Sequence, residues 1–275
     1  MNWRILRPKK ETAHQVKEVP ALPCRFCDEI SSMALALLQN PKKNRLLAAL
    51  PPVVWTRVAP HLELVSLVLG DQLFAPGEAI ESVYFPTSVV ISFLQRVDSQ
   101  TVTGMALAGN EAIIGVNAFL GGDAATELVT VQMTGTAFRM DAQVLMAEFG
   151  RATAFARLAL RYTNAFLVQI SYTGACERVH HIEQRLVRWL LLSADRANSD
   201  DLTLTLTQDA LADLLGVRRE GVNLAAVRLQ ESGLIKYSRG NIMVVDRPGL
   251  EMRACSCYRE IKAEYERFLS AIASQ

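Results

Sequence analysis

The stretch DALADLLGVRREGVNLAAVRLQESGLI, residues 209–235, carries two apolar stripes at helical spacing, separated by a glycine and a pair of arginines. The first stripe predicts a short helix that ends at Gly216, because glycine readily adopts the left-handed conformation of a helix end. The second stripe predicts a helix that begins at Arg218 or Arg219 and ends near Glu231. Such a pair is either an ordinary helical hairpin or a unit that reads DNA.

The sequence on both sides of this pair favours DNA binding. Thr207 is a suitable N-cap for the first helix. After the second helix, LIKYSRGNIMVVD (residues 234–246) predicts a two-stranded wing with its turn at residues 238–241. Helix, tight turn, helix and wing form the order of a winged helix-turn-helix, whose second helix enters the major groove by its N-terminal end. Between Val217 and Arg247, six basic residues outnumber three acidic ones, which suits a phosphate backbone.

The residue types at the start of the second helix predict which side chains read bases. Arginine pairs bidentately with guanine and glutamate accepts from cytosine. The types of Arg219 and Glu220 therefore suit base contacts. Flanking hydroxyls and cations suit phosphate oxygens. Phosphate contacts are expected from Thr207, Arg218, Arg228 and Arg239.

The first half of the chain has a different period. From about Leu64 to Asp141, short runs rich in Val, Ile, Thr and Phe alternate with Gly, Pro, Asn and Asp. This pattern is typical of antiparallel strands that close into a barrel or sandwich. The 275 residues, half of them apolar, are sufficient for one large domain or two ordinary ones. No apolar run is long enough to cross a bilayer, and the basic N-terminus does not have the pattern of a secretory signal.

A long helix is predicted after the strands, because no glycine or proline lies between Arg151 and Thr173. An apolar stripe with alternating steps of three and four follows it. This stripe either packs on the chain's own strands or pairs with a second copy, with Gln169 as the polar layer that sets the register. The second interpretation places the dimer interface at Phe155, Leu158, Tyr162, Ala165, Gln169, Tyr172 and Cys176. A further amphipathic helix is predicted over residues 177–196.

The five cysteines are an odd number scattered over a long chain, which favours a reducing, cytoplasmic setting. Cys24 and Cys27 have the spacing of half a zinc or iron–sulfur site. No further cysteine occurs before Cys176, so a site within the sensor half is short of ligands. The sequence therefore assigns no cofactor, and these two cysteines remain the candidates for a metal.

The chain resembles the Crp/Fnr family of bacterial transcription regulators over roughly residues 45–250. TQDALADLLGVRREGVNLAAVRLQESGLIKYSRGNIMVV carries most of the resemblance, and the PGE and SVYFP stretches support it. The resemblance implies an α+β fold with a cyclic-nucleotide-binding-like antiparallel β-roll, a long dimerisation helix and a C-terminal winged helix-turn-helix. The first turn of the family's recognition helix corresponds to Arg219, Glu220 and Asn223 here, so the resemblance implies base contacts from these three residues. Family members often carry arginine where this chain has Leu224. The implied organisation is an N-terminal extension with the CxxC (1–40), the β-roll domain (41–150), the dimerisation helix (151–178), the DNA-binding domain (179–250) and a C-terminal helix (251–275).

The family's nucleotide-binding members hold the ribose with a glycine–glutamate pair and the cyclic phosphate with an arginine. Here Val116 follows Gly115, and the arginine position falls on or near Thr126. Between Val58 and Phe138 the only Lys or Arg is Arg96, against eight acidic residues. Desolvating a phosphate without a cation is costly, so cyclic AMP or GMP is not expected in this roll.

Catalysis is not expected either. The histidines are His14, His61, His180 and His181, and none lies in the strand-rich segment where a cupin-type metal site would form. No nucleophile elbow, phosphate loop or dinucleotide fingerprint is present. Together with the resemblance, which implies a homodimer on a palindromic site, the sequence predicts a DNA-binding regulator with double-stranded DNA, a second copy and RNA polymerase as partners and no membrane. The alternative is a redox- or ligand-sensing protein whose winged helix mediates protein contacts.

Overall fold

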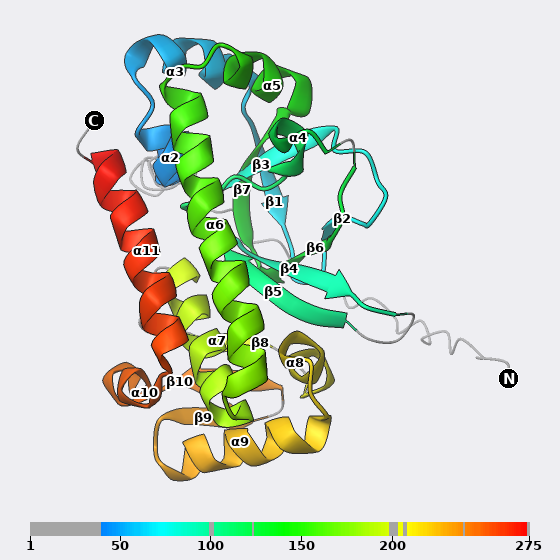
Figure 1. The fold of residues 1–275 in the computed structure, drawn as a ribbon, viewed down its shortest axis with the longest axis vertical. Helices are drawn as coiled ribbons and strands as arrows, with labels where there is room; N and C mark the ends of the chain where they lie inside the picture. The colour runs from blue at the N-terminus through cyan, green and yellow to red at the C-terminus, as the bar shows by residue number, and fades with distance from the viewer. Residues whose placement is uncertain are drawn as a thin grey trace, which may run out of the picture. The chain divides into compact units, whose positions relative to one another are not determined.

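The computed structural model describes residues 40–98, 102–122, 124–197, 203–205, 208–238 and 240–273. The predicted α+β class is confirmed, with antiparallel sheets, one long helix and a C-terminal helix-turn-helix (Figure 1). The predictions for Cys24, Cys27, Thr207 and Arg239 lie outside the described residues. Among the helices described, none combines the length and the apolar character that a membrane crossing requires.

Short helical turns precede the roll, and proline and asparagine determine where they begin. Pro52 is the first residue of its helix, where its fixed φ suits the helix and its missing N–H costs nothing. The buried Asn44 caps another helix by accepting from the Leu47 N–H at 3.1 Å, and its amide donates to the Pro86 and Ala112 carbonyls of the roll. These elements are η1 (Pro41–Lys43), α2 (Arg45–Ala48), α3 (Pro52–Val58) and η2 (Ala59–His61).

The predicted strands form two antiparallel sheets, with the orders β1-β7-β3 and β2-β6-β4-β5. Large side chains from both sheets and from the loop after β5 fill the space between them, and Phe85, Ile91, Ile113 and Met140 have at most 1 % of their surface exposed. The strands are β1 (Glu63–Leu67), β2 (Gln72–Phe74), β3 (Ser82–Pro86), β4 (Val90–Arg96), β5 (Val102–Ala108), β6 (Leu128–Met133) and β7 (Gly135–Asp141). Two short helices, α4 (Asn117–Leu120) and α5 (Ala142–Gly150), complete the roll.

The long helix α6 (Ala154–Val179) passes through Gly174 without ending there. The next helix, α7 (Ile182–Ala197), begins five residues later than the sequence predicts. The chain leaves helical geometry at His180, whose φ and ψ are −108° and 149°. An uninterrupted amphipathic pattern hides this break, because the apolar residues on both sides of it keep helical spacing.

The predicted DNA-binding domain, residues 179–250, is called the DNA-binding part below, and its helices and strands lie close to where the sequence predicts them. Gly216 has a φ of +58°, the left-handed conformation expected between the two helices. The wing pairs β10 with both β8 and β9 in an antiparallel sheet. The elements are β8 (Thr203–Thr205), α8 (Gln208–Leu215), α9 (Arg219–Glu231), β9 (Ile235–Ser238) and β10 (Asn241–Val244), followed by α10 (Arg247–Arg253) and α11 (Ser256–Ala273).

Strand β5 of the roll packs directly against helix α8 of the DNA-binding part (Figure 1). Gly104 makes this approach possible, because a Cβ at that position would lie 2.7 Å from the Leu214 carbonyl oxygen. Gly109 likewise lies against the backbone of Arg196 in α7. Two glycines in the roll therefore let the helices of the DNA-binding part lie against it.

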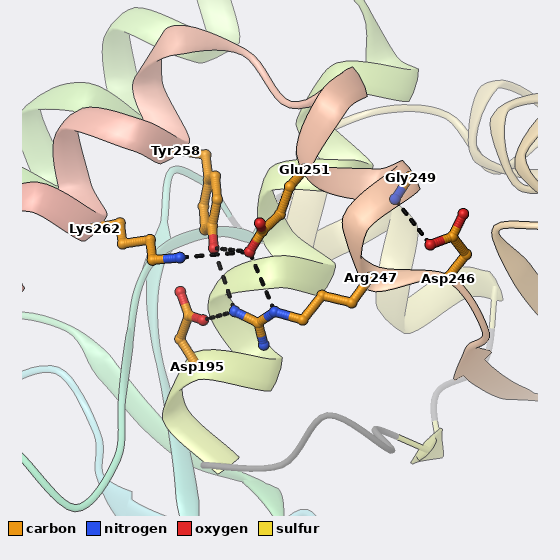
Figure 2. A network of polar contacts seen from close by, with 7 residues as sticks. All are labelled: Asp195, Asp246, Arg247, Gly249, Glu251, Tyr258 and Lys262. Carbon is orange, nitrogen blue, oxygen red and sulfur yellow. Dashed lines mark hydrogen bonds and ion pairs between the residues drawn. The ribbon is translucent and has the colours of Figure 1, made fainter.

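Helices α7, α10 and α11 are joined by a polar network around Arg247 (Figure 2). The Arg247 guanidinium pairs with Asp195 of α7 and, at 3.2 Å, with Glu251 of α10. The Glu251 carboxylate also forms an ion pair with Lys262 Nζ of α11 at 3.4 Å. Arg247 is one of the six basic residues that the sequence suggests for contacts with the phosphate backbone, but in the structure it holds these three helices together.

A second polar contact is buried in the middle of the chain. The Arg196 guanidinium of α7 lies 2.9 Å from the Glu111 carboxylate, which follows β5, and both side chains are at most 6 % exposed. Burial acts to lower the pKa of Arg196, but the neighbouring Glu111 carboxylate raises it, and the net pKa is above its usual value. Arg196 thus stays charged and depends on Glu111 for its compensation.

Replacing Glu111 by Ala should lower the free energy of unfolding by about 3–5 kcal/mol, because a buried guanidinium is left without its partner. The exposed pair Arg139–Glu63 provides the control, since Glu63→Ala should cost less than about 1 kcal/mol. Urea denaturation followed by circular dichroism measures both values. An equal loss of unfolding free energy in the two variants would show that the buried pair contributes no more to stability than the exposed pair.

Candidate nucleic-acid interface

The N-terminal end of α9 presents the residues that the sequence assigns to base contacts. Arg219, Glu220 and Asn223 are all exposed, while Val222, Ala225, Ala226 and Leu229 face the core. Arg218 is the N-cap residue of the helix and is exposed, and Arg228 is exposed in its last turn. The helix therefore separates an inward apolar face from an outward polar face that begins with two arginines.

Gln208, the first residue of α8, holds two of these side chains in place. Its side-chain carbonyl oxygen accepts from Arg219 Nε at 2.9 Å, and its amide donates to Asn223 Oδ1 at 3.0 Å. Arg219 also lies 3.6 Å from the exposed Asp209 carboxylate. One glutamine side chain thus orients an arginine and an asparagine one turn apart on the recognition helix.

An open groove lies between α8, α9 and the wing, lined by Gln208, Arg219, Asn223 and Tyr237 among others. Gln230 accepts from the Tyr237 N–H at 2.7 Å, which fixes the wing to the end of α9. Burial raises the pKa of Tyr237, while a hydrogen bond with Gln208 opposes the rise, so its hydroxyl stays protonated and able to donate. Lys236 precedes Tyr237 in β9 and is exposed.

Leu224 interrupts the polar face of α9. Its side chain is 53 % exposed although it is large and apolar, and Val227, 40 % exposed, lies one turn further on. In the major groove an apolar side chain suits the methyl group of thymine rather than the acceptors of guanine. Leu224 therefore offers an apolar contact at a position where an arginine would donate hydrogen bonds.

The seven residues predicted to line a dimer interface are placed differently by the structure, and this prediction is wrong for the folded chain. Six of them (Phe155, Leu158, Tyr162, Ala165, Gln169 and Cys176) are at most 2 % exposed, and Tyr172 is half-buried. Helix α11 covers this stripe: the Tyr162 and Phe268 rings lie 6.1 Å apart, and Cys176 lies against Cys255. Gln169 donates to the Leu107 carbonyl and accepts from Arg196, so it sets the packing of one chain.

A pocket of about 260 Å³ lies between the roll and α6. Its lining is largely apolar, with Phe93, Met105, Phe166 and Ile170 among the residues that contribute. None of the described residues that line it is Lys or Arg, and the acidic side chain there is Glu127. An anionic phosphate placed in this pocket would meet a carboxylate and no compensating cation, which is unfavourable.

Comparison with known proteins supports the geometry described above. Residues 184–253 match the model of the Crp-like helix-turn-helix domain. This part of the chain is a Crp-like helix-turn-helix domain. A search of curated proteins gives no match to the chain. Because its similarity to the solved structures below lies under 20 % identity, those structures support the fold and the matched domain supports the mode of DNA binding.

Solved Crp/Fnr structures share the fold over most of their length. A regulator assigned to this family from Eubacterium rectale is 14 % identical, with a TM-score of 0.62, and the match covers 77 % of this chain and 98 % of that one. FixK2 from Bradyrhizobium japonicum is 16 % identical, with a TM-score of 0.58 and coverages of 70 % and 98 %. A CRP-family regulator from Thermus thermophilus is 17 % identical, with a TM-score of 0.57 and coverages of 69 % and 96 %.

The sequence analysis does not identify Gln208 as part of the interface. Its role depends on its distance from Arg219 and Asn223 across the turn. A long polar side chain in the first turn of the first helix, facing the start of the second, is the signal that could have found it.

Proposed function

We propose that the protein regulates transcription as a homodimer on an inverted-repeat DNA site, with the N-terminal end of α9 in the major groove. The observation that carries this is the exposed set Arg219, Glu220 and Asn223, of which Gln208 orients the first and the last. A side chain that is already oriented loses less entropy when it meets a base edge. RNA polymerase is the expected protein partner of the bound dimer.

Phosphate contacts on either side of the groove would fix the register of α9. Arg218 and Arg228 are exposed at the two ends of the helix, a spacing that suits the two strands bordering a major groove. Thr207 and Arg239 are proposed from the sequence to add contacts from the start of α8 and from the wing turn. Leu224 is proposed to favour thymine at the base pair it faces.

The dimer would form through the exposed stripe of α6, defined as Leu160, Leu167 and Ser171. Leu160 is 50 % and Leu167 56 % exposed, and the steps of seven and four keep the three residues on one side of the helix, where a second copy of the same helix could pair with them. A twofold DNA site requires a twofold protein, and a helix next to the DNA-binding part is a suitable place for the axis.

The pocket between the roll and α6 is proposed as the effector site, and it would take an uncharged, largely apolar molecule rather than a cyclic nucleotide. Its apolar lining and Glu127 support this, since the described lining offers no cation to a phosphate. A ligand there would contact both the roll and Leu167 of α6, and so could bias the dimer stripe.

The proposed function predicts that full-length protein selects an inverted repeat from a pool of random DNA fragments. Its affinity should fall steeply as salt rises, because phosphate contacts release counterions. Sequencing of the selected fragments and fluorescence anisotropy at several salt concentrations measure the two effects. Failure to bind any fragment below micromolar concentration at low salt would contradict the proposal.

Two single substitutions separate base contacts from phosphate contacts. Arg219→Ala should cost about 1–3 kcal/mol on the selected site and relax the preference at one position in each half-site. Arg239→Ala should weaken binding to all sequences alike and make the salt dependence shallower. Competition binding with single-base variants of the site tests this. If both variants lose affinity equally on every sequence, the assignment of roles is wrong.

Leu160→Lys tests the dimer stripe. The substitution places like charges close to each other across the proposed axis, so the dimer dissociation constant should rise at least tenfold by an order-of-magnitude estimate from charge repulsion. Light scattering after size exclusion, over a range of concentrations, measures it. Val53→Lys on α3, where the native side chain is 71 % exposed, is the matched control and should stay dimeric. A Leu160→Lys protein as dimeric as the control would show that the interface lies elsewhere.

A further inference from the structure

Four side chains with metal-binding atoms meet at the C-terminal end of α6. Cys176 lies in the last turn of that helix and His180 directly follows the helix, while Cys255 and Cys257 come from the junction between α10 and α11. Their sulfur and ring nitrogen atoms all lie within 4.8 Å of one another. The three cysteines are buried and unoxidised, and His180 is half-buried.

The separations fit a single tetrahedral ion. Cys176 Sγ lies 3.7 Å from Cys255 Sγ, and Cys257 Sγ lies 3.6 Å from His180 Nδ1. Zn–S bonds of about 2.3 Å and Zn–N bonds of about 2.0–2.1 Å at tetrahedral angles give edges of about 3.8 Å between sulfurs and about 3.6 Å between sulfur and nitrogen. An iron–sulfur cluster places its own atoms between the ligands and needs a wider cage.

The chain positions these ligands by local geometry. His180 caps α6, and its backbone N–H donates to the Cys176 carbonyl, which keeps the two residues next to each other at the end of the helix. Cys255 precedes α11 and Cys257 lies in its first turn, where the free N–H groups and the helix dipole favour thiolates. The ligand set is thus assembled from two segments about 80 residues apart in the sequence.

A buried cation next to the cluster supplies the charge balance that such a site needs. Three thiolates, one neutral imidazole and one Zn²⁺ carry a net charge of −1. The Arg188 side chain is 5 % exposed, and its charge acts on all three thiols. Arg188 donates to Thr173 Oγ1 at 2.8 Å, while its Nε has no hydrogen-bond partner among the described residues. An anionic metal centre would compensate this buried guanidinium.

We propose that Cys176, His180, Cys255 and Cys257 bind one structural Zn²⁺. On binding, the three thiols release their protons to solvent and the imidazole binds in its neutral form. Four protein ligands leave no open position, so the ion would be structural rather than catalytic. It would fasten the start of α11 to the end of α6, next to the break at His180 where the chain turns into the DNA-binding part. This inference does not depend on the proposed DNA site.

Metal analysis of the full-length protein tests the site. Protein purified without a metal-affinity tag, under reducing and anaerobic conditions, should contain about one zinc ion per chain, as measured by inductively coupled plasma mass spectrometry. Cys255→Ser/Cys257→Ser and His180→Ala should each lose most of it. His181→Ala changes the neighbouring histidine and Cys24→Ser/Cys27→Ser removes the N-terminal pair, so both controls should keep their zinc.

Cobalt titration provides a readout that does not depend on how the variants fold. Added to the wild-type apoprotein, Co²⁺ should give visible bands of a tetrahedral site and a near-ultraviolet thiolate-to-metal band, both abolished by one equivalent of Zn²⁺. Absence of these bands together with a zinc content near zero would overturn the proposal. So would zinc retained in Cys255→Ser/Cys257→Ser, or a Cys176–Cys255 disulfide found in metal-free wild-type protein under the same reducing conditions.

Discussion

The buried contact between Arg196 and Glu111 is the constraint on which the arrangement of the chain depends. A guanidinium and a carboxylate have left water here, and their desolvation is tolerable only if every remaining donor finds a partner. Gln169 of α6 accepts at 2.7 Å, the Leu107 carbonyl accepts at 3.3 Å, and the Tyr265 ring of α11 lies 3.8 Å below the guanidinium. The roll and three helices must therefore meet at one point.

That meeting point fixes the DNA-binding part relative to the roll. Arg196 lies in the last turn of α7, and the recognition unit follows it in the chain. Gly104 and Gly109 of the roll let α8 and the end of α7 approach β5 at backbone distance. Phe166 of α6 packs on Phe93 of the roll, and β5 of the roll packs on both α6 and α8.

The sequence was sufficient for features set by local chemistry. Gly216 predicted the turn between two helices, residues 238–241 predicted the wing turn, and the alternation of apolar residues predicted the strands. The exposed positions of Arg219, Glu220 and Asn223 followed from the helical period alone. These features depend on residues that lie within one or two turns of each other along the chain, so the sequence shows them directly.

Features set by contacts between distant segments could not be predicted in the same way. The role of Gln208 depends on a side-chain contact across a turn, and the break at His180 lies inside an unbroken amphipathic pattern. The Cys3His cluster joins Cys176 to residues that the sequence left without any partner. Periodicity shows that a face is apolar, but it does not show which element covers that face.

The apolar stripe of α6 shows this limit most clearly. Its heptad spacing predicts packing either on the chain's own strands or on a second copy, and in the structure α11 of the same chain packs against it. The two helices run antiparallel: Tyr162 meets Phe268, Asn164 donates to Glu264 at 2.9 Å, and Cys176 meets Cys255 (Figure 1). A tethered helix has an effective concentration that a second copy cannot match at ordinary protein concentrations. Because α11 occupies this face, the C-terminal helix leaves only the other, exposed side of α6 for the dimer proposed above.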